Sequence, residues 1–462
     1  MNYLWPAQDV RIRLSSLHPQ VSVPQPEQAL GSMGMLQQLE LAEEGFVIDL
    51  HPDLSPNAEI VLRLDYSAAG YEDFQFIRVL LNPSFYTLRE NKIATTISGT
   101  GRVGYEDGAK TRGIGFEFQE ENMLYEMGLM IGVDSQRVVS SVRAQSGIHD
   151  DFVELERLER QEPGTIADVE VSGRFTDARA YHTRQLGVEV AYRIYAWREA
   201  PHDQSLLFIY KIYNRTAAPL EKLVVGYFAD WDINPQGYKD LADWDPNTQT
   251  ALVYAAPKEG RRVAGVQLLG ATPNYWAMDN TTHLQEGNIG VYDGFTEAEK
   301  YKALSSGIAN PRAGEPEQGS DVSIALGAGP FSLAPGDSLT VAFALHGAGS
   351  IDELLAAAAH IQDLWEHTAG LHTPTGLVAN SLPGLQLYPN PSRGEVTLHW
   401  PEQQQLPYTL RVFDRAGRLV QVQQATGAGA GGIRLQLPPQ GGLYLLEVQQ
   451  GGRRALRRVL VH

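Results

Sequence analysis

The sequence predicts an all-β protein made of three β-sandwich-type domains in series, with one helix closing the central domain. Apolar and polar residues alternate with a period of two along most of the 462 residues, which is typical of strands with one buried face. Clusters of Gly, Pro, Asn and Asp separate the alternating segments and mark turns. A single stretch, residues 350–365, repeats its apolar residues at helical spacing instead.

The first predicted domain is a small immunoglobulin-like sandwich at residues 1–86. Its expected strands lie near residues 10–14, 20–23, 46–50, 59–66 and 74–81. Alternation is already established at residues 10–14, with no charged-apolar-small segment ahead of it, so no signal peptide is recognisable in this chain. We therefore expect any export signal to lie upstream of Met1.

The second predicted domain is a large sandwich at residues 87–369. Its strongest signal is a pair of aromatic-rich strands at 188–197 and 206–213, which we expect to form an antiparallel hairpin. Further strands are expected at residues 222–228, 250–254, 263–269, 323–326 and 338–345. The helix at 350–365 closes this domain, with Ser350 as its N-cap and Glu353 reaching back to complete a capping box.

A linker rich in Gly, Pro and Thr is predicted at residues 370–384, and a third small sandwich at 385–462. Six or seven short strands are expected there, with segments at residues 395–400, 408–414, 419–423, 433–437, 441–448 and 455–461. Composition changes at the same place. From Ser381 onward the chain has nine Arg, no Lys and four acidic residues, whereas the remainder is strongly acidic.

Composition excludes several classes of function. The chain has no cysteine, so a disulfide framework, a thiolate zinc site and a cysteine nucleophile are all impossible. A formal net charge of −18 argues against a nucleic-acid partner, because phosphate backbones require a basic face. No run approaches the roughly 18 to 20 apolar residues of a membrane-spanning helix, so we predict no transmembrane segment.

Residues 230–245 hold a dense set of oxygen-bearing side chains that predicts a calcium ion. Calcium takes about six to eight oxygen ligands, and the expected ones are Asp230, Asp232, Asn234, Asp243 and Asp245. The stretch follows an EF-hand loop only in part, since Asp243 replaces the required glutamate and Pro235 interrupts it. The alternative is that these side chains initiate turns by accepting hydrogen bonds from their own backbone.

The same stretch also suggests carbohydrate chemistry. Trp231, Tyr238, Trp244 and Trp276 offer aromatic rings for stacking on sugars, and glycoside hydrolysis requires a pair of carboxylates. The sequence does not fix the separation of the carboxylates, so sugar binding without catalysis and a calcium-dependent hydrolase both stay open. Residues 31–35 lack a nucleophile elbow, residues 98–108 lack a phosphate-binding loop, and no histidines have zinc-site spacing. No catalytic set is therefore identified in this chain, and whether it is an enzyme stays uncertain.

Four motifs follow one another at the C-terminus. The first is the turn "YPNP", Tyr388, Pro389, Asn390 and Pro391, followed by Gly394. The next are the hairpin "VFDRAGRLV" with Asp414, Gly417 and Arg418, and the strand "GGLYLLEV" with Gly442 and Tyr444. The last is the basic strand "RRALRRVLV". In this order, residues 385–462 resemble the type A C-terminal sorting domain of cargo exported by the type IX secretion system of Bacteroidetes-type bacteria.

That resemblance indicates where the protein is located rather than which reaction it catalyses. It implies Sec export of a longer precursor, passage through the outer membrane by the type IX machinery as partner, and a secreted or cell-surface protein. Dense arginine without lysine departs from the family's usual pattern.

A weaker resemblance covers residues 1–370. Segments such as "TTISGTGRVGY", "DFVELERL", "FADWDI" and "PFSLAPGDSLTVAFAL" are similar to a β-rich region downstream of subtilisin-like serine peptidase domains in some type IX cargo. None of the peptidase motifs is present, so the resemblance implies that any catalytic residues lie upstream. Two hypotheses follow: a non-catalytic portion accessory to a serine peptidase, or a stand-alone adhesin or glycan-binding protein that uses residues 230–245.

Overall fold

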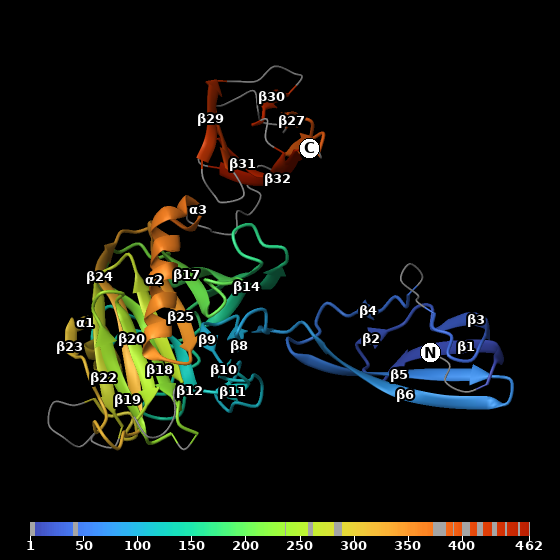
Figure 1. The fold of residues 1–462 in the computed structure, drawn as a ribbon. Helices are drawn as coiled ribbons and strands as arrows, with labels where there is room; N and C mark the ends of the chain where they lie inside the picture. The colour runs from blue at the N-terminus through green and yellow to red at the C-terminus, as the bar shows by residue number, and fades with distance from the viewer. Residues whose placement is uncertain are drawn as a thin grey trace. The chain divides into compact units, whose positions relative to one another are not determined.

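The computed structural model of the chain divides into two compact units, Met1–Ser84 and Phe85–His462 (Figure 1). The described residues are 5–39, 45–235, 237–256, 262–280, 289–372, 385–390, 392–399, 407–413, 419–426, 432–438, 441–450 and 453–461. Strands dominate them, which confirms the all-β prediction. None of the helices in these ranges is both long and apolar enough to cross a bilayer.

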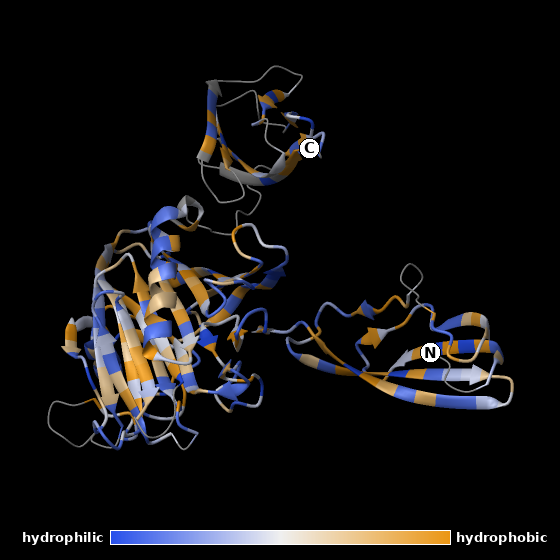
Figure 2. Cartoon of the chain, in the orientation of Figure 1, coloured by the Kyte–Doolittle hydropathy of each residue, from blue (hydrophilic) through white to orange (hydrophobic). Residues whose placement is uncertain are grey.

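The first unit is a four-stranded antiparallel sheet with a two-stranded pair over one face. The sheet order is β3 (Glu27–Met33), β1 (Ala7–Ser16), β5 (Ala58–Ala68) and β6 (Tyr71–Leu81), and the pair is β2 (Val21–Ser22) with β4 (Asp49–Leu50). Hydrophobic and hydrophilic residues are interspersed along β5 and β6 (Figure 2), and burial alternates along the first half of β5, which places Ile60 and Leu62 in the core. The sequence did not predict β3, because its Ala, Gly and Ser residues carry little strand signal.

The central part of the second unit is a sandwich of two large sheets. The eleven-stranded sheet runs β11 (Glu121–Asn122), β10 (Phe116–Phe118), β8 (Ile93–Ser98), β9 (Arg102–Val103), β12 (Leu124–Gly132), β18 (Leu220–Trp231), β24 (Val322–Leu333), β22 (Pro273–Asp279) and β23 (Ile308–Asn310), with β7 (Phe85–Leu88) beside β8 and β13 (Val138–Ser140) beside β12. The eight-stranded sheet runs β14 (Val153–Gln161), β15 (Val169–Thr176), β16 (Val188–Ala196), β17 (Ser205–Asn214), β25 (Ser338–Ala348), β21 (Val263–Leu269), β20 (Thr250–Ala255) and β19 (Asp240–Asp245). The predicted hairpin is confirmed as β16 and β17, with Ala196 opposite Leu206.

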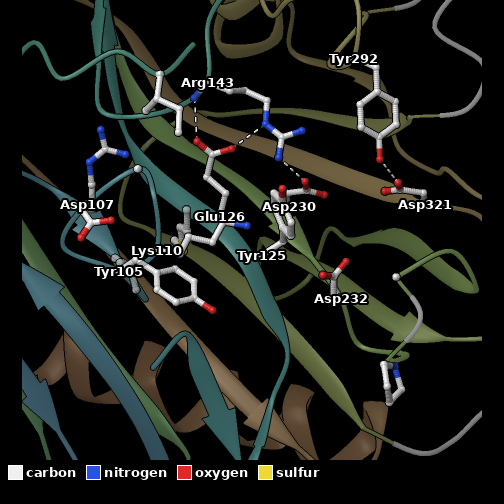
Figure 3. Close-up of a pocket in the computed structure, with 17 residues that line it drawn as sticks. Tyr105, Asp107, Lys110, Tyr125, Glu126, Arg143, Asp230, Asp232, Tyr292 and Asp321 are labelled. Carbon is white, nitrogen blue, oxygen red and sulfur yellow. Dashed lines mark hydrogen bonds and ion pairs between the residues drawn. The ribbon is translucent and has the colours of Figure 1, made fainter. Parts of the chain in front are cut away.

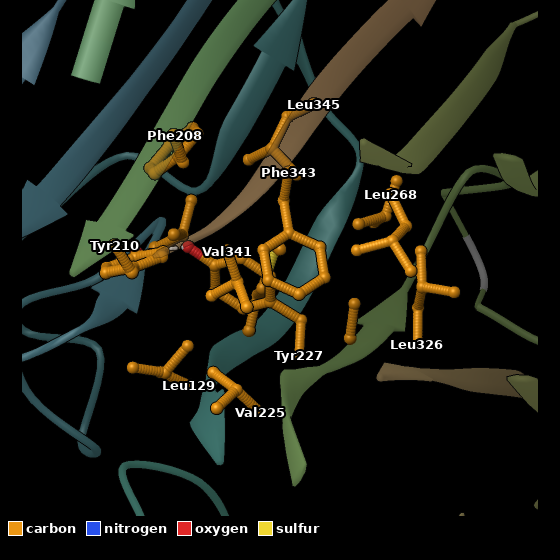
Figure 4. Close-up of a cluster of buried hydrophobic side chains, with 14 of the residues drawn as sticks. Leu129, Phe208, Tyr210, Val225, Tyr227, Leu268, Leu326, Val341, Phe343 and Leu345 are labelled. Carbon is orange, nitrogen blue, oxygen red and sulfur yellow. Dashed lines mark hydrogen bonds between the residues drawn. The ribbon is translucent and has the colours of Figure 1, made fainter. Parts of the chain in front are cut away.

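Alternate residues of both sheets meet in one large core. On β18, Val225, Tyr227 and Trp231 belong to this core. Phe343 on β25 packs edge-on against Tyr227, with ring centroids 5.2 Å apart (Figure 4). The hydroxyls of Tyr227 and Tyr210 hydrogen-bond to each other within the core. Burying each such aromatic side chain contributes roughly 2 to 3 kcal/mol. Residues between them on β18, including Asp230, consequently face away from the core.

Helices cover the outer faces of the two sheets. The predicted helix is α2 (Ile351–His367), which packs on β25 and β21. Ser350 caps it as predicted, but the Glu353 carboxylate accepts from Gly349 N rather than from the N-cap backbone. The structure adds α1 (Glu297–Ser305) and the four-residue α3 (Ala369–His372). The sequence did not reveal α1, because its charged residues give a weakly amphipathic pattern.

The C-terminal part of the chain forms a small sandwich. One sheet contains β26 (Gln386–Tyr388), β27 (Glu395–His399) and β30 (Ile433–Gln436). The other contains β29 (Leu419–Thr426), β28 (Pro407–Phe413), β31 (Gly442–Gln450) and β32 (Arg453–Val461). Val396 and Leu398 from the first sheet share one core with Leu410, Leu446 and Val459 from the second.

Candidate functional site

A polar pocket opens on the outer face of the eleven-stranded sheet, with a cavity volume of about 500 Å³. Its walls come from β9 and the loop that follows, from β12, from the segment after β13, from the end of β18, and from residues near β24. The residues that carry its chemistry are Arg102, Tyr105, Asp107, Lys110, Tyr125, Glu126, Arg143, Asp230, Asp232, Tyr292 and Asp321. Acidic groups outnumber basic ones in this set, so the lining carries net negative charge.

A β-bulge in β12 builds the centre of the pocket. Leu124 pairs with Trp231 and Glu126 pairs with Asp230, so Tyr125 is an extra residue between two regular pairs. Bulges of this kind redirect side chains and are common beside functional sites. Tyr125 is 46% exposed and lies in the pocket, where the Lys110 ammonium sits over its ring. The bulge therefore places the carboxylates of Glu126 and Asp230 side by side with an accessible aromatic ring.

Arg143 holds these two carboxylates together (Figure 3). Its Nε donates to Glu126 Oε2 at 2.6 Å, its backbone N donates to Glu126 Oε1 at 2.7 Å, and its terminal nitrogen pairs with Asp230 Oδ2. Burial opposes the charged guanidinium, but the two ion pairs outweigh it and raise the pKa of Arg143. One buried cation is thus shared between two acids, which fixes the geometry of the pocket floor.

A second set of hydrogen bonds extends from Asp230 to the opposite wall. Asp230 Oδ1 accepts from the Ser323 hydroxyl at 2.8 Å, and Asn280 Nδ2 donates to Ser323 Oγ at 2.9 Å and to Asp321 Oδ1 at 2.6 Å. Tyr292 donates its hydroxyl to the other oxygen of Asp321. Asp230, Asp321 and Tyr292 are therefore positioned by one continuous network rather than by chance proximity.

The pKa values of two carboxyl groups in the pocket, Asp230 and Asp232, are raised. Burial, reinforced by the nearby Asp321 and Asp232 carboxylates and opposed by Arg143, raises the pKa of Asp230 to about 6. Burial and Asp321 also raise the pKa of Asp232. A cavity with perturbed acids and convergent polar groups is the usual form of a binding or catalytic site.

Of the five predicted calcium ligands, the structure brings two to the pocket. Asp230 and Asp232 line it, whereas Asn234, Asp243 and Asp245 do not. Asp243 accepts from Trp244 N and pairs with Arg312, and Asp245 accepts from Thr248 N at 2.8 Å. Within the described ranges, no three or more His, Cys, Asp or Glu side chains are grouped so that they could hold a metal ion. The calcium ion stays a prediction.

The aromatic residues expected to stack on sugars lie outside the pocket lining. Trp231 is buried in the main core, Trp244 stacks on Tyr275 with centroids 5.1 Å apart, and the Lys302 ammonium covers the Trp276 ring. Tyr105, Tyr125 and Tyr292 line the pocket instead, and none of the three was predicted from the sequence. The signal that was available was the broken alternation at Leu124, Tyr125 and Glu126, which marks the bulge.

The C-terminal sandwich shows why its motifs occur together. Asn390 Oδ1 accepts from Leu460 N at 2.9 Å, and Ser392 N donates to Leu460 O at 2.7 Å, so the "YPNP" turn is tied to the last strand. Gly394 has φ +106°, a conformation that suits glycine, and its carbonyl accepts from Leu437 N at 2.7 Å.

The other motif residues divide into two groups. Tyr444 is buried in the core of the sandwich, and Gly442 begins β31. Pro391, Asp414, Gly417 and Arg418 lie outside the described residues, as does most of the predicted linker.

Residues 386–462 match the family model of the secretion system C-terminal sorting domain. No curated protein matches the sequence. Among solved structures, the Slr1438 protein from Synechocystis sp. PCC 6803 is similar at 10% identity and a TM-score of 0.30, over 58% of this chain and 96% of that one. A polysaccharide lyase, BACCELL_00875, is similar at 13% identity and a TM-score of 0.21, over 74% and 39%.

A third similarity is to dimeric latent PorU from Porphyromonas gingivalis, at 12% identity and a TM-score of 0.14, over 77% of this chain and 36% of that one. TM-scores this low carry no argument about function.

The C-terminal sandwich and its family match define an exported β-protein whose C-terminal domain is a sorting domain for secretion. Residues 386–462 belong to the secretion system C-terminal sorting domains, and the resemblance described above assigns them to the type IX system. The chain is therefore secreted or displayed at the cell surface through the type IX machinery.

Proposed function

We propose that the central sandwich is a non-catalytic, saccharide-binding module of this exported protein, and that the ligand occupies the polar pocket on the eleven-stranded sheet. The observation that carries the proposal is the pocket itself: an open cavity of about 500 Å³ that combines tyrosine rings with a fixed network of acids and an arginine. Small-ligand sites commonly fall between about 300 and 1,000 Å³.

The chemistry of the lining suits a polyhydroxylated ligand. Tyrosine rings offer an apolar face for the C–H groups of a sugar and a hydroxyl at the edge. Asp232 and Asp321 supply acceptors for hydroxyl groups, and Lys110 supplies a donor. A sugar that stacks on Tyr125 would lie within reach of both kinds of group.

The ion pairs of the two central carboxylates, Glu126 and Asp230, favour binding without catalysis. Hydrolysis of a glycosidic bond requires one acid to transfer a proton and the other to act as a base or nucleophile. Glu126 and Asp230 are instead both committed to the Arg143 guanidinium. Their role in the proposal is to orient Arg143 and shape the pocket floor.

Glycan-array binding followed by titration calorimetry on residues 1–462 tests the proposal. Tyr125→Ala removes an exposed ring that lies beside the Arg143 guanidinium and keeps both carboxylate partners of Arg143. Saccharide affinity should fall about tenfold or more, because the stacking contact is lost. Tyr181→Ala is the control, because Tyr181 is exposed and does not line the pocket. The proposal fails if no saccharide binds, or if Tyr125→Ala and Tyr181→Ala bind alike.

The predicted calcium ion is tested in the same assay. If Asp230 and Asp232 hold calcium, chelation should lower saccharide affinity and Asp232→Asn should make the affinity insensitive to chelation. Unchanged binding after chelation would rule out a calcium-dependent site.

A second candidate role is accessory to an upstream subtilisin-like serine peptidase. It is favoured by the resemblance of residues 1–370 to the region that follows such peptidases. It is compatible with saccharide binding, which would hold the enzyme at a glycan-bearing surface. The intact mass and N-terminus of the native extracellular species decide it: an upstream peptidase domain supports the accessory role, and a species that begins near Met1 contradicts it.

A further inference from the structure

Strand β6 is an edge strand of the first unit, with neither a proline nor a β-bulge along its length. Among the described residues it pairs only with β5, through eleven consecutive residue pairs without a register shift. The edge strand β14 of the central sandwich, by contrast, is interrupted by two register irregularities. Prolines and bulges are two of the features that ordinarily stop an edge strand from adding another strand, and β6 has neither. It does carry one charge, Asp73, on the face of Ile77 and Val79, where the Asp73 carboxylate accepts from Phe74 N.

The outward face of β6 carries an ordered pattern of side chains. Ile77 and Val79 pack into the core of the unit, so Glu72, Phe74, Phe76 and Arg78 share the opposite face. Phe74 and Phe76 are 48% and 54% exposed and contact each other with ring centroids 5.4 Å apart. Within the part of the chain that the structure describes, neither Glu72 nor Arg78 forms an ion pair. Two aromatic rings therefore lie between an acid and a base that have no partner along the strand.

We propose that β6 is a self-association edge, at which a second copy of this chain adds its own β6 in antiparallel orientation about a two-fold axis at Gln75. This register places Glu72 opposite Arg78 of the second copy, and Phe74 opposite Phe76 of the second copy. Symmetry makes each pair twice, so one interface holds two ion pairs and two aromatic pairs on one face. The two four-stranded sheets become one continuous sheet of eight strands.

The order of side chains on β6 favours this register, and it favours a second copy of this chain as the partner strand. Moving the axis to Phe76 keeps the faces matched but places Glu72 opposite Leu80, so both ion pairs are lost. A strand of another protein would need the same order of acid, aromatic, aromatic and base at alternate positions. This chain supplies that order itself, in the only antiparallel register that pairs both charges.

Sedimentation velocity over a concentration series of residues 1–462 tests the proposal. We expect a monomer–dimer equilibrium for the natural sequence. Glu72→Arg places two like-charged pairs across the axis and should weaken dimerisation about tenfold, and Arg78→Glu should do the same. The double variant, Glu72→Arg with Arg78→Glu, restores both ion pairs in swapped positions and should recover most of the lost affinity.

Controls separate this interface from general charge effects and from misfolding. Glu27→Arg reverses an exposed acid on β3, at the other edge of the same sheet, and should leave dimerisation unchanged. Far-ultraviolet circular dichroism checks that each variant keeps its strands. A monomer at every concentration, a double variant that is no better than the single ones, or an equal effect of Glu27→Arg would each overturn the proposal.

Discussion

Glu154 lies half-buried on β14, and its Oε1 accepts no hydrogen bond from any described residue. Burial raises the pKa of Glu154 to about 7, with Arg157 opposing the shift and Glu106 adding to it. The folded pKa therefore lies above the usual value of about 4.5. Because the unfolded chain releases this proton first, the contribution of Glu154 to stability falls as the pH rises from about 4.5 to about 7.

We expect Glu154→Gln to leave the free energy of unfolding unchanged near pH 4.5 and to raise it at pH 8. A shift from 4.5 to 7 corresponds to at most roughly 3 kcal/mol, and partial solvent exposure reduces this to about 1 kcal/mol. Urea unfolding at both pH values measures the difference in free energy of unfolding between Glu154→Gln and the natural sequence. Glu159→Gln, at an exposed site on the same strand, should leave the free energy of unfolding unchanged at both pH values. An equal effect of Glu154→Gln at both pH values would show that the raised pKa of Glu154 does not govern the change.

Arg143 shows what the sequence could not predict at the residue scale. Its partners Glu126 and Asp230 lie 17 and 87 positions away along the chain, so only the pairing of β12 with β18 brings them together. Asp230 and Asp232 were singled out from local spacing alone, and they do line the pocket. Asp243 and Asp245 had equally good spacing, but the strand β19 carries them away from it.

At the scale of elements, α1 depends on glycine in the two strands beneath it. Gly226 on β18 stands opposite Gly327 on β24, and Leu304 of α1 lies against both. A Cβ at Gly226 would collide with the Leu326 carbonyl oxygen and would lie 2.7 Å from Leu304 Cδ2. Because the Leu326 carbonyl belongs to the backbone of β24, β18 cannot shift to relieve this contact.

Gly226→Ala should therefore destabilise the central sandwich by about 3 kcal/mol, through overpacking between β18, β24 and α1. Thermal unfolding followed by tryptophan fluorescence measures the loss. Gly349→Ala is the matched control, because its new Cβ would meet only the end of the Glu353 side chain. Comparable stabilities for the two variants would show that α1 does not rely on the glycine pair.

The turn between β26 and β27 is the element that joins the two ends of the sorting domain. Gly394→Val forces a β-branched residue into φ +106°, which costs roughly 1 to 3 kcal/mol, and should loosen the turn bound to β32. Export of the full chain should fall, whereas Val422→Thr at an exposed position on β29 should leave it unchanged. Normal secretion of Gly394→Val would show that this turn is not needed for recognition.

Strands and helices were predictable from the sequence where apolar residues repeat regularly along them. The β16–β17 hairpin and α2 were found because their patterns are long and regular. The capping box of α1, Thr296 with Glu299, was present in the sequence, but the helix behind it has too few apolar residues to stand out. The bulge in β12 breaks the alternation on which strand prediction rests, so the centre of the pocket was found only in the structure.

At the scale of the whole molecule, separate parts of the chain carry separate tasks. The central sandwich has a deep apolar core and a polar pocket on its outer face. The C-terminal sandwich has its own core and carries the sorting motifs that match a secretion family. We expect the secretion machinery to recognise the folded surface of this domain rather than a linear peptide, and we expect the central sandwich to fold without it.

Export through the type IX system can be measured as the amount of protein outside the cell. Residues 1–462 and residues 1–384 are each expressed behind the same signal peptide, in a host with type IX secretion and in a mutant that lacks it. We expect only residues 1–462 in the competent host to reach the surface or the medium, while the shorter chain stays folded in the periplasm. Equal export of residues 1–384, or export of residues 1–462 without the machinery, would contradict this expectation.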